Sequence, residues 1–236
     1  MPGVLEENLK DITELLQKKS ETEKTIIPLV NLYAKTISNR FRETLLTWVL
    51  DTSSSFNLSI HTGLLACSYI DKFLSIKQDF SNGILDLLGV VAISIASRFN
   101  EKISISPPAI SKALESKFTI EMVLSVELLM LQVLDWKLNM TTPCEIIGVL
   151  LESTVQKPES TVMLKVASAF SSVCYVDSEL ACYGNFLIAV SSILLAIDKL
   201  GISGFKKTWL ERARIHSLSD CKQIVCKVYS KILKNN

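Results

Sequence analysis

The chain has 236 residues, of which 48% are hydrophobic and 21% are charged, so it can bury a substantial core and is not a disordered polypeptide. Its 25 Lys and Arg residues nearly balance its 24 Asp and Glu residues, which removes the simplest charge argument for a nucleic-acid or acidic-membrane partner. The most apolar windows, near residues 87–97 and 186–197, are too short to cross a bilayer, which takes about 20 residues of helix.

The first thirty residues mix acidic, basic and apolar positions, without an apolar signal core or the Arg residues of a mitochondrial presequence. We therefore expect the chain to stay in the nucleus and cytoplasm. Several apolar residues in this stretch share one face of a predicted helix over about 4–19. These residues are Leu5, Leu9, Ile12, Leu15 and Leu16.

Helical periodicity dominates the rest of the chain, and the prolines lie where helices would start or stop. The pattern predicts five helices before a short linker, near 38–54, 59–75, 84–100, 107–115 and 119–135. Pro143 follows this linker and suits the first turn of a new helix. Five more helical patterns follow, near 143–154, 160–175, 185–200, 205–215 and 218–233.

We therefore predict an all-α protein built from two consecutive five-helix bundles with an N-terminal helix. The N-terminal helix and its lead-in occupy 1–37, the first bundle 38–136 and the second bundle 143–236. The third helix of each set, over 84–100 and 185–200, is long and apolar, which supports a repeat although residue identity between the two sets is slight.

Two charged residues interrupt long apolar helical runs: Arg98 in ILDLLGVVAISIASRFNE and Glu127 in IEMVLSVELLMLQVLDWKL. A guanidinium or a carboxylate in an apolar wall is costly unless it is paired or hydrogen-bonded. Each of these two side chains therefore needs a partner, either within the fold or on another molecule.

Together with FRETLLTWVL (41–50) and YIDKFLS (69–75), these segments resemble the first box of the cyclin family. That box carries an Arg on its first helix, an Asp on its second, a Leu and a Lys on its third and a Glu on its fifth. The matching residues here are Arg42, Asp71, Leu87, Arg98 and Glu127. Arg98 stands where the family usually has Lys, and a planar guanidinium forms hydrogen bonds of a different geometry. The resemblance covers roughly 30–145, and the compact chain looks similar to the D-type cyclins and to the cyclins encoded by herpesviruses.

The resemblance implies a regulatory subunit, without catalytic groups of its own, that binds and activates a cyclin-dependent protein kinase and controls cell-cycle progression. In cyclins, the residues matching Arg98 and Glu127 hydrogen-bond the αC helix of the kinase beside an apolar socket. The socket positions here are Ile95, Phe99, Leu131, Trp136 and Leu138. The alternative is a private salt bridge between Arg98 and Glu127, with the five apolar residues in an ordinary core.

The resemblance also implies an internal ion pair between Arg42 and Asp71, which ties the first helix of the box to the second. Some cyclins use a shallow groove to recruit substrates or inhibitors with a basic-x-Leu motif. The matching positions here are Phe41, Thr44, Leu45, Trp48, Asp51 and Asp86. Thr44 replaces a larger aliphatic residue and Asp86 replaces a Gln, so a core or plain surface role for these positions stays open.

The sequence offers no constellation of residues for catalysis. It has two histidines, His61 and His216, and it lacks GxSxG, HExxH and Gly-rich phosphate-loop motifs. Its six cysteines show no CxxC spacing, so we expect small core residues and neither a metal nor another cofactor. An enzyme is therefore disfavoured.

The stronger rival is a cyclin-fold transcription factor that binds DNA or the transcription machinery. One modest basic helix over 205–215 is its main support, with Lys206, Lys207, Arg212 and Arg214. Steeply salt-dependent DNA binding would favour that rival, since counterions are released when basic residues contact phosphates.

Overall fold

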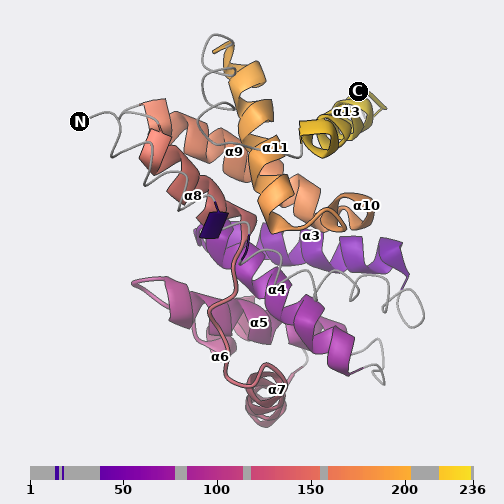
Figure 1. Ribbon diagram of the computed structural model, residues 1–236. Coiled ribbons are helices and arrows are strands. Elements are labelled where there is room, and N and C mark those ends of the chain that lie inside the picture. Colours follow the sequence, from indigo (N-terminus) through magenta and orange to yellow (C-terminus); the bar gives the residue numbers. More distant parts are fainter. Residues whose placement is uncertain are drawn as a thin grey trace. The chain divides into compact units, whose positions relative to one another are not determined.

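The structure is a computed structural model that describes residues 14, 15, 18, 38–77, 84–113, 118–154, 159–202 and 218–234. The regular elements in these ranges are helices, so the predicted all-α class is confirmed (Figure 1). None of the described helices is long and apolar enough to span a bilayer. The helix predicted over 205–215 lies outside the described residues, as does the helix predicted over 4–19 apart from residues 14, 15 and 18, which are helical.

Residues 28–142 form one compact unit, which we call the first unit, and residues 143–236 belong to the other, which we call the second unit. The helices of the first unit are α3 (Asn39–Ser55), α4 (Ile60–Ile76), α5 (Leu85–Asn100), α6 (Pro107–Ala113) and α7 (Ile120–Val133).

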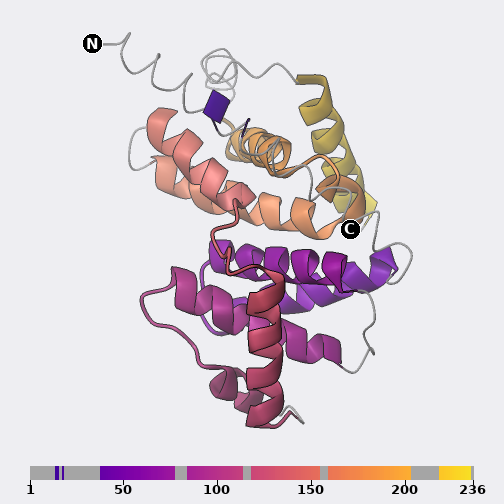
Figure 2. The same ribbon diagram turned by 60° about the horizontal axis from the view of Figure 1, so that its bottom comes forward.

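Helix α5 is the centre of the first unit, because it packs against α3, α4, α6 and α7. It is apolar on every side, which is the pattern of a buried helix, and all of its residues from Leu87 to Ser97 are buried. Helix α7 is seen end-on in Figure 1 and lengthwise in Figure 2, where it lies across α5. Arg98, in the last turn of α5, contacts Glu127 of α7.

Side-chain caps decide where three of these helices begin. Ser38, Ser59 and Thr119 precede α3, α4 and α7, and each accepts a hydrogen bond from a backbone N–H three residues later. Such caps satisfy donors that the first turn of a helix leaves unpaired. Pro107 begins α6 without losing a helical hydrogen bond, since the N–H groups of a first turn have no partner within the helix.

Arg42 and Asp71 join α3 to α4 through a buried ion pair. Arg42 Nε donates to Asp71 Oδ1 over 2.9 Å, and Nη2 donates to Oδ2 over 2.8 Å. The two side chains are only 4% and 5% exposed. This two-bond geometry is the one in which a guanidinium and a carboxylate match best, so the pair predicted from the sequence is present.

The second unit is arranged around helix α11 in the same way. Its helices are α8 (Pro143–Thr154), α9 (Glu159–Val176), α10 (Ser178–Ala181), α11 (Asn185–Leu200) and α13 (Leu218–Lys234). Helix α11 packs against each of the other four. The one-turn helix α10, capped by Asp177, was not predicted from the periodicity, because four residues are too few to show a helical repeat.

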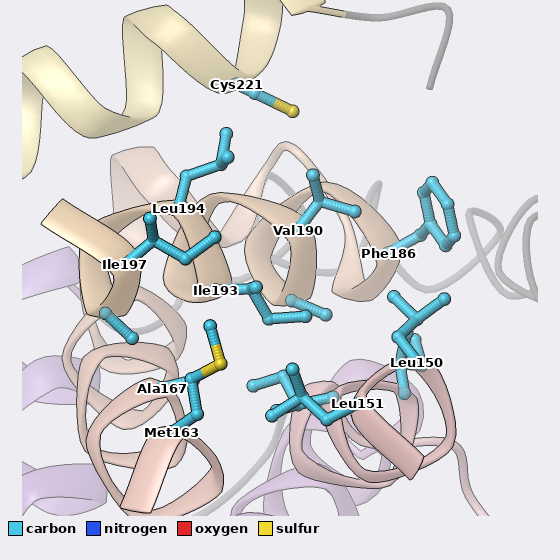
Figure 3. Close-up of a cluster of buried hydrophobic side chains, with 14 residues drawn as sticks. Leu150, Leu151, Met163, Ala167, Phe186, Val190, Ile193, Leu194, Ile197 and Cys221 are labelled. Carbon is cyan, nitrogen blue, oxygen red and sulfur yellow. The ribbon is translucent and has the colours of Figure 1, made fainter. Parts of the chain in front are cut away.

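Figure 3 shows the core of the second unit, in which Phe186, Val190, Ile193 and Ile197 project from α11. Side chains from three other helices surround them: Leu150 and Leu151 of α8, Met163 and Ala167 of α9, and Cys221 of α13. Gly201 ends α11 with a φ of 72°, a left-handed conformation that glycine adopts without steric cost.

The cysteines are free, and four of them are buried. Cys182 is half-buried and Cys226 is exposed on α13, so the expectation of core positions is wrong for Cys226. Burial raises the pKa of the buried Cys67 thiol above its ordinary range. The thiol therefore stays protonated and serves as an apolar filler.

Substituting Asp71→Ala should lower the free energy of unfolding by about 3 to 5 kcal/mol, because it removes the carboxylate that pairs with a buried guanidinium. The double variant Asp71→Ala with Arg42→Met should recover part of that loss, since no buried charge is then stranded. Denaturant unfolding followed by circular dichroism measures both effects.

A matched control is Lys137→Ala, which breaks a pair with Asp135 whose side chains are 80% and 76% exposed. We expect little change in the free energy of unfolding, because water and salt screen a fully exposed pair. If Asp71→Ala unfolds at the midpoint of the unmodified chain, the buried pair does not hold α3 to α4.

Candidate functional site

Arg98 and Glu127 pair with each other across the contact between α5 and α7. Arg98 Nη2 lies 2.7 Å from Glu127 Oε1, and the two side chains are 43% and 13% exposed. Arg98 also directs its Nε toward the Ser94 carbonyl oxygen one turn earlier, at 3.4 Å. The intramolecular salt bridge that the sequence left open as an alternative is therefore present in the chain by itself.

This salt bridge leaves hydrogen-bonding capacity unused on both sides. Glu127 Oε2 is buried and has no hydrogen-bond partner among the described residues. A buried carboxylate oxygen without a donor is unfavourable by about 1 to 3 kcal/mol. The half-exposed guanidinium of Arg98 also has more N–H groups than these two contacts use. Arg98 can therefore still offer donors to a second molecule, whereas the buried Glu127 Oε2 becomes an acceptor for one only when the side chain turns outward.

Helix α7 is exposed to an extent that its sequence does not explain. The segment IEMVLSVELLMLQV is apolar almost throughout, yet only Val123 and Met130 of the helix are buried. Ile120, Leu124 and Leu128 are 57%, 56% and 51% exposed, and their spacing of four residues aligns them along one side. A soluble fold seldom leaves an apolar helix this open unless another molecule covers it.

The predicted socket residues divide between surface and core. Phe99 and Trp136 are 49% and 62% exposed, and Leu131 and Leu138 are half-buried. Ile95 is only 3% exposed, so its prediction as a contact residue is corrected to a core position. It lies in the part of α5 that is buried on every side, whereas exposure begins at Arg98.

The turn after α7 holds Trp136 in an uncommon conformation. Asp135 and Trp136 have φ values of 53° and 55°, which is left-handed backbone in residues other than glycine. The hydroxyl of buried Tyr69 donates to the Leu138 carbonyl oxygen over 2.8 Å and so fixes the end of the turn. Strained backbone of this kind is common at functional positions.

Asn100 and Glu101 tie the end of α5 to the start of α4. Glu101 Oε1 accepts from the backbone N–H of Ser59 over 2.9 Å and from its hydroxyl over 2.8 Å, and also from the Thr62 hydroxyl. Asn100 Nδ2 donates to Thr62 Oγ1 over 2.8 Å. We call these four residues the α4–α5 clamp.

The clamp was not predicted, although the sequence held a signal for it. A carboxylate at the C-terminal end of a helix opposes the dipole of that helix. Glu101 occupies such a place after Asn100, so it is better explained as a ligand of another helix's N-terminus. Partial burial opposes ionisation, but hydrogen bonds from Thr62 and Ser59 outweigh it and lower the pKa of Glu101.

The predicted docking positions lie on α3 and at the start of α5. Trp48 covers Gly89 of α5 so closely that a Cβ on Gly89 would lie 2.3 Å from Trp48 Cζ3. Thr44, Asp51 and Asp86 are exposed, while Phe41 and Trp48 are half-buried. Leu45 is 6% exposed, so it is a core residue and not part of an open groove. The basic residues Lys206, Lys207, Arg212 and Arg214 lie outside the described residues.

Comparison with known proteins identifies relatives for more than half of the chain. The family described as "Cyclin, N-terminal domain" matches residues 11–139. G2/mitotic-specific cyclin S13-6 of Glycine max is 28% identical over 203 residues, which are 82% of this chain and 42% of that protein. G1/S-specific cyclin-D1 of Mus musculus is 26% identical over 192 residues, which are 80% of this chain and 65% of that protein.

A solved structure extends the likeness to most of the fold. The viral cyclin from Herpesvirus saimiri superimposes with a TM-score of 0.74 at 17% sequence identity, covering 89% of this chain and 96% of that one. Mitotic and G1/S proteins both match, so the comparisons do not single out a subfamily. The chain spans less than half the length of cyclin S13-6 of Glycine max.

Substituting Glu101→Gln should lower the free energy of unfolding at pH 7 by about 1 to 2 kcal/mol, because it removes the charge that caps α4. The pKa of Glu101 is lowered in the folded chain, so its contribution is present above the unfolded pKa of about 4.3 and is lost as the pH falls through the folded value.

The difference between Glu101→Gln and the unmodified chain should therefore shrink below about pH 4. Thermal unfolding between pH 3 and pH 7 measures it. Asp51→Asn removes one exposed carboxylate from α3 and controls for the change in net charge. A constant difference across this pH range would contradict the capping role.

Proposed function

The chain belongs to the cyclin family, and on that premise we propose that it is a non-catalytic regulatory subunit that binds and activates a cyclin-dependent protein kinase, and so controls cell-cycle progression. The observation that carries this proposal is the exposed apolar side of α7, which adjoins the Arg98–Glu127 pair. The surface combines a large apolar area with a central polar pair, which suits a protein partner.

The proposed partner element is the αC helix of the kinase. A partner helix can lie along α7, because side chains spaced four residues apart form a ridge that fits the groove of another helix. Arg98 can donate to a backbone carbonyl oxygen at the end of that helix, and Glu127 can accept from a backbone N–H through Oε2 once its side chain turns outward. Phe99 and Trp136 add exposed aromatic area at the edge.

Activation then follows from binding one conformation of the kinase better than another. A protein kinase is active only when a Glu on αC pairs with the Lys that positions the nucleotide phosphates. A rigid surface that fits only the inward position of αC shifts the kinase toward it. Moving that equilibrium from 1:99 to 99:1 takes about 5.5 kcal/mol of differential affinity, which is within reach of an interface of about 2,000 Å².

We also propose a second, weaker binding role at the surface of α3. Trp48 offers a half-exposed indole, while Asp51 and Asp86 are exposed carboxylates suited to the cation of a basic-x-Leu peptide. The Thr44 hydroxyl donates to the Arg40 carbonyl oxygen over 2.9 Å, so it is already satisfied within its own helix. Thr44 therefore presents its methyl group as the apolar contact for the peptide's Leu.

The proposed function is tested by co-purifying the chain with a panel of cyclin-dependent kinases and assaying histone phosphorylation by each complex. We expect at least one kinase to be retained and activated. Retention of none, together with DNA binding that falls steeply with salt in a gel-shift titration, would favour the transcription-factor alternative.

Substituting Arg98→Ala, and separately Glu127→Ala, should weaken the kinase complex by about 1.5 to 3 kcal/mol each, because charge-assisted hydrogen bonds are lost. Kinase activation should fall together with the affinity of the complex. Calorimetric titration measures the affinity, and circular dichroism checks that each variant is folded. Lys227→Ala, which alters a pair with Glu179 at 3.9 Å in the second unit, is the control. Unchanged affinity in both folded variants would leave Arg98–Glu127 as a structural pair only.

A labelled basic-x-Leu peptide should bind the α3 surface weakly, with an affinity that falls as salt rises because exposed charges are screened. Thr44→Ile should tighten this binding by about 1 kcal/mol through added apolar contact, and Asp51→Ala should weaken it. Fluorescence polarisation measures both. Absence of saturable binding by the unmodified chain and by Thr44→Ile would remove the docking role.

A further inference from the structure

We propose that Asn100 and Glu101 are positioning residues for the kinase-binding surface, because the α4–α5 clamp fixes the last turn of α5 and with it the place from which Arg98 reaches a partner. This inference rests on the proposed function. Neither residue was among the predicted contact residues, and neither needs to touch the kinase to act in this way.

The hydrogen bonds of the clamp converge on two atoms. The first atom, Glu101 Oε1, accepts hydrogen bonds from the backbone N–H and the hydroxyl of Ser59 and from the Thr62 hydroxyl. Thr62 Oγ1 also accepts from Asn100 Nδ2, and Thr62 itself is fully buried. Several hydrogen bonds that share one acceptor and one buried hydroxyl leave little freedom for the backbone of residues 100 and 101.

A second set of bonds holds the chain that follows. The Ser94 hydroxyl donates to the Ile105 carbonyl oxygen over 3.1 Å, and the Ile105 backbone N–H donates to Ser97 Oγ over 3.1 Å. The single hydroxyl hydrogen of Ser97 is shared between the carbonyl oxygens of Ser94 at 3.0 Å and Ile105 at 3.4 Å. The segment from Glu101 to Ile105 is therefore anchored at both of its ends. The end of α5 cannot shift unless one of these anchors breaks.

Arg98 needs such support because its own attachment is limited. Its side chain is 43% exposed and reaches α7 through one close contact with Glu127. A long exposed side chain loses conformational freedom when a partner immobilises it, and a fixed backbone reduces that loss. Binding groups work best when a supporting shell of hydrogen bonds holds the element that carries them.

The central comparison uses two substitutions at Thr62. Thr62→Val removes the hydroxyl at nearly constant volume, while Thr62→Ser keeps the hydroxyl and rescues the clamp. With the kinase that the unmodified chain retains, we expect Thr62→Val and Glu101→Gln each to raise the dissociation constant about fivefold or more, and Thr62→Ser to leave it within about twofold. Ser38→Ala removes the cap of α3 and is a control that destabilises the unit without removing any hydrogen bond of the clamp.

A double-mutant cycle separates positioning from general loss of stability. If Glu101 acts through Arg98, adding Glu101→Gln to Arg98→Ala should change the dissociation constant by less than about twofold, because the group being positioned is already gone. A full effect of Glu101→Gln in the Arg98→Ala background would overturn the proposal. Equal losses of affinity in Ser38→Ala and Glu101→Gln would overturn it as well.

A measurement on the free chain distinguishes failure of this inference from failure of the proposed function. The NMR signal of the Arg98 Nε–H should shift in Glu101→Gln and in Thr62→Val, but not in Ser38→Ala or in Thr62→Ser. If no kinase binds but this pattern appears, the kinase-binding function fails and the positioning stands. An Arg98 signal that is the same in all variants would overturn the positioning role, whatever the kinase does.

Discussion

The burial of α5 is the constraint on which the rest of the first unit depends. From Leu87 to Ser97 the helix contacts protein on every side, and from Arg98 onward it is exposed. A helix buried all round can hold only small and apolar side chains, so the polar groups of the site can appear only where this burial ends. The packing of the first unit therefore determines where the Arg98–Glu127 site lies. The Arg42–Asp71 pair contributes to that packing by joining α3 to α4.

The two ion pairs of the first unit differ in how completely their hydrogen-bonding groups are satisfied. Arg42 and Asp71 are almost fully enclosed and satisfy each other through two short bonds, so their contact is complete without a partner molecule. Arg98 and Glu127 form a single close contact at the surface and leave one carboxylate oxygen without a donor. A guanidinium and a carboxylate thus form a fully satisfied contact between α3 and α4, and a partly satisfied one between α5 and α7.

Much of the fold was predictable, because apolar spacing reports helices directly. The pattern over 84–100 corresponds to α5 within one residue, and the pattern over 185–200 corresponds to α11. Prediction failed where the structure depends on a local backbone conformation that apolar spacing does not report, or on a contact between residues far apart in the chain. Helix α7 ends at Val133 because Asp135 adopts left-handed backbone, and the clamp joins Glu101 to a residue 42 positions earlier in the chain. Residue spacing alone carries neither kind of information.

The open side of α7 also affects the chain before it meets any partner. Ile120, Leu124 and Leu128 are on the surface of the isolated chain, and exposed apolar side chains are what chaperones and proteases recognise. A partner that covers them would protect the chain from both. The cellular concentration of the chain would then follow the supply of that partner, and any excess would be removed without a separate degradation signal.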